Sequence, residues 1–151
     1  MECATDYDAD VMFLSETWLR SRRNEVTAEV DEFGYALYHT IRKNRAKETG
    51  GGVGVLVKKT LQVKQIKSSQ FQTFEHHAIK INVRRNLWVT YVSIYRLDYE
   101  PIDLFFTEFR QLLELSSDEK CIIAGDINIH CDNEDDRHTL QLNNNEKCEI
   151  C

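Results

Sequence analysis

The segment "LWVTYVSIYRLDYEPIDLFFTEFRQLLELSSDEKCIIAGDINI", residues 87–129, contains hydrophobic patterns of two different periods. Residues 87–95 and 121–129 are short and rich in Val, Ile and aromatic side chains, which is typical of strands. Between them, apolar residues recur at helical spacing and predict an amphipathic helix over 101–116, with Pro101 in its first turn. A strand, a crossover helix and a second strand imply a parallel or mixed sheet covered by helices.

Three more segments, 10–14, 52–59 and 76–83, have the length and composition of strands. In the last of them, Ile79, Ile81 and Val83 alternate with polar residues and are predicted to share one face. His76 and His77 belong to the same strand, and we expect that part of the strand to face solvent. Five strands and one helix predict an α/β fold.

Four of the six glycines are crowded into the stretch "GGGVG", Gly50 to Gly54. One interpretation is a phosphate-binding loop, but the stretch lacks the Lys-Ser/Thr ending of a P-loop and the full spacing of a dinucleotide fingerprint. The interpretation that we favour is a tight turn with close backbone packing where a strand enters the sheet.

The composition is that of one soluble globular domain, with 42% hydrophobic and 29% charged residues in 151. No stretch approaches the roughly 18 uncharged apolar residues of a membrane span. The acidic N-terminus is unlike a secretory signal, and five irregularly spaced cysteines fit free thiols in a reducing compartment. We therefore predict an intracellular protein, nuclear or cytoplasmic, that does not engage a membrane.

The net charge of −6 is unevenly distributed along the chain. Residues 131–151 hold six acidic and two basic residues and so contribute −4, while the basic runs 20–23 and 42–47 could face phosphates or be solvated surface. Near the C-terminus, His130, Cys131, Cys148 and Cys151 are soft metal ligands, but their spacing is poor for a zinc site. The prediction is a folded domain over 1–132 and an acidic, disordered tail over 133–151.

Two predicted strands end in polar side chains that a core would not accept without a partner. Asp126 and Asn128 close the last strand, and Glu16 follows the first strand by two residues. Taken alone, Glu16 is best explained as a carboxylate at the start of a short helix. Together, Glu16 and Asp126 offer the oxygen ligands with which a protein binds Mg²⁺ while the ion keeps several waters.

Five motifs occur in a recognisable order: "LSETWL" (14–19), "GGGVGVLV" (50–57), "FEHHAIKI" (74–81), "VSIYR" (92–96) and "AGDINIH" (124–130). In order and rough spacing they resemble the endonuclease/exonuclease/phosphatase superfamily, and within it the apurinic-type endonuclease domain of non-LTR retrotransposon polyproteins. The resemblance implies a two-sheet α/β sandwich flanked by helices, incomplete in this chain.

The resemblance also implies a role for each matching residue. Glu16 is similar to the family's carboxylate ligand of a catalytic Mg²⁺ or Mn²⁺, and Asp126 to the aspartate that orients or deprotonates the attacking water. Asn128 is similar to the amide that holds the scissile phosphate, and Tyr95 to the tyrosine beside it. The implied chemistry is in-line hydrolysis of a phosphodiester in DNA.

The sequence also departs from the family pattern. Family members begin with a strand that carries a metal-binding asparagine and end with strands that deliver an aspartate and an S-D-H histidine, and the 151 residues contain neither motif. We therefore expect part of a metal-dependent DNA endonuclease domain that binds its metal weakly and is inactive alone. The alternative is a degenerate, non-catalytic domain that binds a metal, a nucleic acid or a protein.

Overall fold

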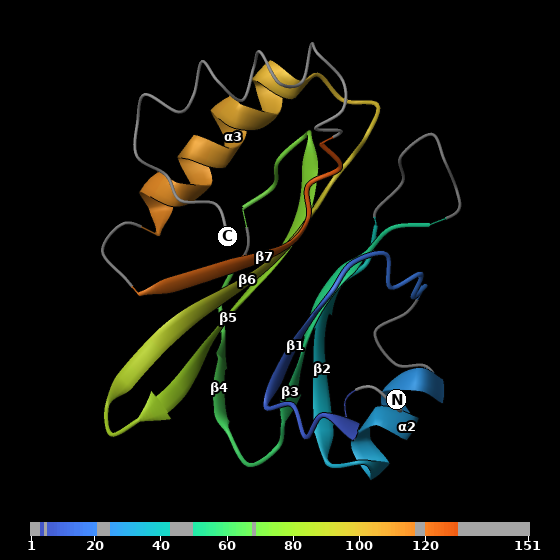
Figure 1. Cartoon of the computed structure of the whole chain (residues 1–151), viewed down its shortest axis with the longest axis vertical. Coiled ribbons are helices and arrows are strands. Elements are labelled where there is room, and N and C mark those ends of the chain that lie inside the picture. The colour runs from blue at the N-terminus through green and yellow to red at the C-terminus, as the bar shows by residue number, and fades with distance from the viewer. Residues whose placement is uncertain are drawn as a thin grey trace.

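The described residues form two β-sheets and two helices. The computed structural model describes residues 4, 6–20, 25–42, 50–67, 69–116 and 120–129. One sheet contains β1 (Val11–Leu14), β3 (Val53–Lys58) and β2 (Tyr35–Thr40), in that order. The other contains β4 (Gln62–Gln65), β5 (Phe74–Arg84), β6 (Leu87–Arg96) and β7 (Cys121–Asp126). Figure 1 shows the sheets as two layers, with β1, β2 and β3 on one side and β4 to β7 on the other.

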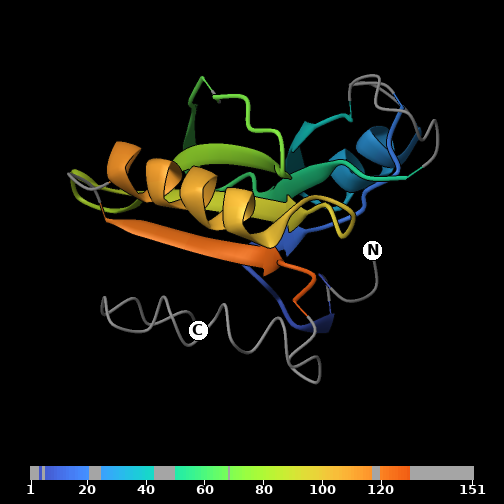
Figure 2. The ribbon, with the colours of Figure 1, turned by 90° about the horizontal axis from the view of Figure 1, so that it is seen from above.

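The strand–helix–strand unit is present as predicted. β6 pairs parallel with β7, and all the other strand pairs are antiparallel, so the four-stranded sheet is mixed. The connecting helix α3 (Ile102–Leu115) runs along this sheet (Figure 2). It buries Phe105 and Leu112 against Phe74, Val92 and Ile94. Pro101 stands one residue before the first turn, where its carbonyl accepts a hydrogen bond from the Phe105 N–H at 3.1 Å.

The two sheets pack through a layer of branched aliphatic side chains. Val55 and Val57 of β3 meet Ile79 and Ile81 of β5, and all four are fully buried. Burial of this kind stabilises by about 1.5–3 kcal/mol for each side chain. The far face of the three-stranded sheet is covered by α2 (Glu25–Glu32), whose Val30 packs with Leu56 and Tyr35. The predicted two-sheet α/β sandwich is therefore confirmed.

Several details of the sequence interpretation were wrong or incomplete. β2, β4 and α2 were not predicted. β4 reads "QVKQ" and α2 reads "EVTAEVDE", each with few apolar residues, while the apolar residues of β2, "YALYHT", do not alternate with polar ones. Val83 is 42% exposed, since the register shifts between Asn82 and Arg84 and turns it off the buried face. His76 does not face solvent, because it is only 6% exposed and lies beside the rings of Phe71 and Phe74.

Some predictions fall outside the described residues. They concern the acidic tail over 133–151, His130 with the terminal cysteines, and most of both basic runs. In the part of the chain that the structure describes, neither helix has the length and apolar character needed to cross a membrane.

Candidate functional site

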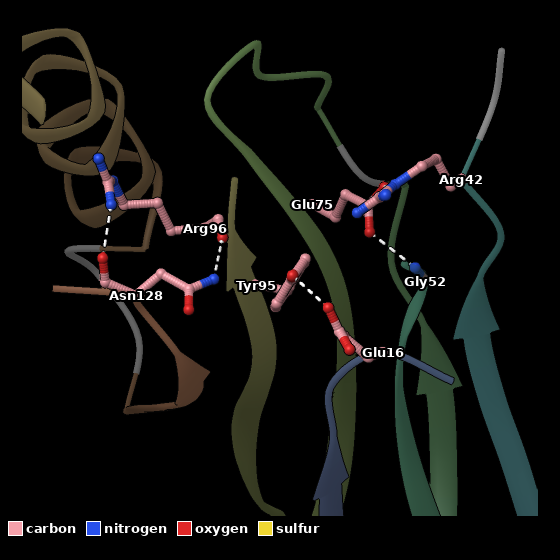
Figure 3. A network of polar contacts seen from close by, with 7 residues as sticks. All are labelled: Glu16, Arg42, Gly52, Glu75, Tyr95, Arg96 and Asn128. Atoms are coloured by element: carbon pink, nitrogen blue, oxygen red, sulfur yellow. Dashed lines mark hydrogen bonds and ion pairs between the residues drawn. The ribbon is translucent and has the colours of Figure 1, made fainter. Parts of the chain in front are cut away.

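Three neighbouring strands bring polar side chains to one edge of the four-stranded sheet. Glu75 of β5 pairs in register with Tyr95 of β6, and Tyr95 pairs with Asp126, the last residue of β7. Glu16, which follows β1 of the other sheet, accepts a hydrogen bond from the Tyr95 hydroxyl (Figure 3). The Ser93 hydroxyl also reaches across the sandwich and donates to the Leu14 carbonyl at 3.1 Å. The site therefore spans both sheets, and Tyr95 lies at its centre.

The segment that carries Glu16 is a fixed loop. Thr17 N–H donates to the Gly52 carbonyl at 3.0 Å and Trp18 N–H to the Gly51 carbonyl at 2.9 Å. Glu16 and Trp18 both have positive φ, 50° and 55°, which is incompatible with a right-handed helix. The short helix expected at Glu16 is absent for this reason, and the Glu16 side chain is exposed to solvent.

The glycine-rich stretch lies directly against this loop. Gly50, Gly51 and Gly52 have φ of 92°, 81° and 87°, a conformation that other residues adopt only at a cost. A Cβ on Gly51 would lie 2.1 Å from Cζ of Arg42, so the guanidinium occupies the space that a side chain would need. The close backbone packing that we expected where this strand enters the sheet is thereby confirmed.

A buried ion pair stands beside Tyr95. Arg42 Nε lies 2.6 Å from Oε1 of Glu75, and the Gly52 N–H donates to Oε2 of Glu75 at 2.7 Å (Figure 3). Both side chains are largely buried, with 12% and 8% exposed. Burial alone would lower the pKa of Arg42, but the hydrogen bond and charge of Glu75 outweigh it and raise this pKa. Neither Glu75 nor Arg42 was predicted as a site residue, although Glu75 lies within a motif that carried the resemblance.

The chain after β7 is held by reciprocal hydrogen bonds with β6. Arg96 Nη1 donates to the Asn128 carbonyl, and Asn128 Nδ2 donates to the Arg96 carbonyl, both at 2.7 Å (Figure 3). Asn128 N–H donates to Oδ1 of Asp126 at 2.9 Å. Arg96 is 5% exposed and also donates to the Glu100 carbonyl. Arg96 thus fixes the residues that follow β7, a role that its place in the sequence did not indicate.

Close strand packing explains the glycine before Asp126. Gly125 has φ of 149°, and a Cβ there would lie 1.9 Å from the Ile94 carbonyl oxygen of the paired strand. Only glycine allows β7 to approach β6 so closely. The approach places Asp126 next to Tyr95 in the sheet.

Tyr95 is held in its neutral form. Burial raises the pKa of its hydroxyl, and the hydrogen bond to the Glu16 carboxylate raises it further, while the Asn128 amide and Arg42 act in the opposite direction. Of the residues that the sequence singled out, Glu16 and Asn128 thus interact with this phenol, and Asp126 is the register partner of Tyr95 in the sheet.

The carboxylates of the site bear on the divalent metal that the resemblance implies. No group of three or more His, Cys, Asp or Glu side chains in the described residues could hold a metal ion. Glu16 and Asp126 form no salt bridge within the described part of the chain, and Glu16 contacts a neutral phenol. One or two free carboxylates with several waters are what Mg²⁺ accepts, so these oxygens fit a weakly held hard cation.

Comparisons with known proteins agree with this architecture. The chain is similar to the endonuclease domain of TRAS1, a telomere-specific non-LTR retrotransposon, with a TM-score of 0.63 and 15% identity over 91% of this chain and 60% of that one. It is also similar to ANGEL2, a 2′,3′-cyclic phosphatase, with a TM-score of 0.65 and 18% identity over 84% of this chain and 41% of that one. The chain thus spans about three fifths and two fifths of these two structures.

The sequence comparisons give the family directly. No curated protein matches the sequence significantly. The model of the endonuclease/exonuclease/phosphatase family matches residues 2–146, nearly the whole chain. The resemblance seen in the motifs is confirmed, and the chain belongs to the endonuclease/exonuclease/phosphatase family.

Proposed function

We propose that this chain is part of a divalent-metal-dependent phosphodiesterase domain that acts on DNA, as in a retrotransposon endonuclease. The observation that carries the proposal is the contact between Glu16 and Tyr95 across the two sheets, at the edge where β7 delivers Asp126 and Asn128. Carboxylates, an amide and a neutral phenol at one edge suit the binding of a metal and a phosphate.

Each residue has a role in this proposal. Glu16 would hold the metal, whose chemistry when bound is to neutralise charge that develops on the phosphate. The Tyr95 hydroxyl donates to Glu16 in this structure, and it would donate to a phosphate oxygen instead once Glu16 holds the metal. Asn128 is held by Arg96 through its backbone carbonyl and through one N–H of its side-chain amide, and the second N–H of that amide would bind the same phosphate. Asp126 is exposed beside Tyr95 and would orient or deprotonate the attacking water.

Metal binding and DNA cleavage are expected to differ in this chain. The 151 residues lack the family's metal-binding asparagine strand and its S-D-H motif. General acid–base help is typically worth about 10² to 10⁴ in rate, and groups that act as a unit fail together. We therefore expect weak metal binding and no cleavage above background by this chain alone.

A plasmid-nicking assay tests the proposal. Purified chain is incubated with supercoiled and abasic DNA and with Mg²⁺ or Mn²⁺, beside Glu16→Ala, Asp126→Ala and the control Asp31→Ala. Asp31 is an exposed carboxylate of α2 that pairs with Lys59. The expected result is no nicking above background by any form. Nicking that both site substitutions abolish and the control retains would show that these residues suffice for catalysis and would contradict the expected inactivity.

A further inference from the structure

Trp18 is an exposed aromatic residue that the proposed roles do not use. It is 62% exposed, two residues after Glu16, and belongs to none of the core clusters formed by the described residues. A single exposed apolar side chain is ordinary on a protein surface. Trp18 differs because contacts with the neighbouring backbone fix the position of its indole ring.

Backbone contacts hold this indole in place. The Trp18 N–H donates to the Gly51 carbonyl, and a Cβ on Gly50 would be in van der Waals contact with the ring, 3.6 Å from Cζ2. The positive φ of Trp18 costs roughly 1–2 kcal/mol, and such conformations persist where the surroundings enforce them. Thr17, between Glu16 and Trp18, turns inward and buries its hydroxyl oxygen. Glu16, which bonds to Tyr95, and Trp18 are therefore exposed on the same fixed loop.

A cation lies near Trp18, and a second exposed aromatic ring lies near that cation. The Arg42 guanidinium lies against Gly51 and stands 5.7 Å from the centre of the Tyr95 ring. Tyr99 is 50% exposed and close enough to Arg42 to influence its pKa electrostatically. Trp18, Arg42 and Tyr99 together form what we call the aromatic rim of the site.

An aromatic rim beside a phosphate site matches one kind of ligand. Proteins that hold single-stranded nucleic acid combine cations that follow the backbone with aromatic rings on which bases stack. A base inside a duplex has both faces covered by its neighbours, so only an unpaired base can stack on an exposed indole. We propose that Trp18 stacks on an unpaired base of the DNA strand whose phosphate lies beside Tyr95. This inference rests on the proposed function and narrows its substrate to strands with an unpaired base at the site.

Tryptophan fluorescence gives a direct test, because the chain has only two tryptophans. The other, Trp88, lies near the start of β6 with Lys64 Nζ 4.0 Å from its ring centre, far along the strand from Tyr95. In Trp88→Phe, Trp18 is the only indole. A short single-stranded oligodeoxynucleotide, titrated in EDTA so that nothing is cleaved, should quench its emission, and a blunt duplex of the same sequence should quench it far less.

Affinity measurements complete the test. Stacking of a base on an aromatic ring is worth about 1–3 kcal/mol, so Trp18→Ala should weaken single-strand binding about 5- to 150-fold. Trp88→Ala is the matched control and should leave the affinity unchanged. Circular dichroism checks that both variants fold, and the quenching in Trp88→Phe reports on Trp18 in a chain whose site is intact.

The outcomes separate this inference from the proposed function. Unchanged single-strand affinity in Trp18→Ala, equal quenching by single strand and duplex, or no binding of single strand would each overturn the inference. If Mn²⁺ binds at Glu16 but Trp18 is not needed for single-strand binding, the proposed function stands without the inference. If Trp18 is needed but Mn²⁺ does not bind at Glu16, stacking stands and the metal-dependent function fails.

Discussion

Two glutamates lie close to Tyr95, in very different surroundings. Glu75 is 8% exposed, paired with Arg42 at 2.6 Å and bonded to the Gly52 N–H, so both of its oxygens have partners within the protein. Glu16 is exposed, accepts a hydrogen bond from the neutral Tyr95 hydroxyl, and forms no salt bridge in the described residues. The same side chain thus occurs once as part of the framework and once facing solvent.

The difference indicates which carboxylate is available for chemistry. The charge of Glu75 is already balanced, and a second cation there would have to displace Arg42. Among the residues that the structure describes, none balances the charge of Glu16, and a hard cation could share it with water. Glu75, which is buried with a counterion, has a structural role in this site. Glu16, which is exposed beside a neutral hydrogen-bond donor, is the group proposed to bind the metal.

The largest expected effect comes from removing the framework glutamate. Glu75→Ala leaves the Arg42 guanidinium largely buried without its counterion, and breaking a buried pair in this way typically costs about 3–5 kcal/mol. Urea unfolding followed by circular dichroism measures the loss in unfolding free energy. Asp31→Ala, which removes an exposed partner of Lys59, is the control and should cost at most about 1 kcal/mol. If Glu75→Ala loses as little unfolding free energy as the control, Glu75 does not have the structural role that distinguishes it here from Glu16.

The next effect comes from a buried ionisable group beside Glu75 on β5. Burial lowers the pKa of His76 from 6.5 to about 4, so the unfolded chain takes up a proton in this interval and the folded chain does not. The unfolding free energy therefore keeps this contribution above pH 6.5 and loses it as the pH falls toward 4. A pKa shift of one unit corresponds to about 1.4 kcal/mol, so the loss is roughly 3 kcal/mol.

The pH dependence of urea unfolding measures this contribution. The wild type should lose more unfolding free energy than His76→Gln between pH 6.5 and 4, since carboxylates that titrate in the same range are common to both. Parallel curves for the two proteins would mean that His76 is protonated in the folded chain.

Sequence reasoning succeeded where a single pattern determined the structure. The change of period between 87 and 129 was enough to predict β6, α3 and β7, because these segments lie next to one another in the sequence and have regular patterns. It failed for His76, because β5 is buried on both faces. Ile79 and Ile81 face the other sheet, while Phe74, His76 and Ala78 face α3, and strand alternation alone does not show that a helix covers the second face.

The candidate site was predicted only in part for a similar reason. Glu16, Tyr95, Asp126 and Asn128 were found through short motifs. Glu75 and Arg42 are separated by 33 positions, and their pairing depends on how β2 and β5 approach across the sandwich. Arg96 contacts backbone carbonyls, which any sequence supplies, so no residue pattern identifies its partners.

The smallest expected effect on stability belongs to Glu16, whose substitution tests the central claim most directly. Glu16→Gln should change the unfolding free energy by no more than about 0.5 kcal/mol, as is usual for exposed positions. It should, however, abolish metal binding, which is measured by titrating the isotopically labelled chain with Mn²⁺ and following the broadening of its amide NMR signals. In the wild type and in the Asp31→Ala control, the signals of Glu16, Tyr95 and Asp126 should broaden first, and in Glu16→Gln this selective broadening should disappear. The same broadening in Glu16→Gln, or broadening centred on the carboxylates of α2 in the wild type, would contradict the assignment of Glu16 as the metal ligand.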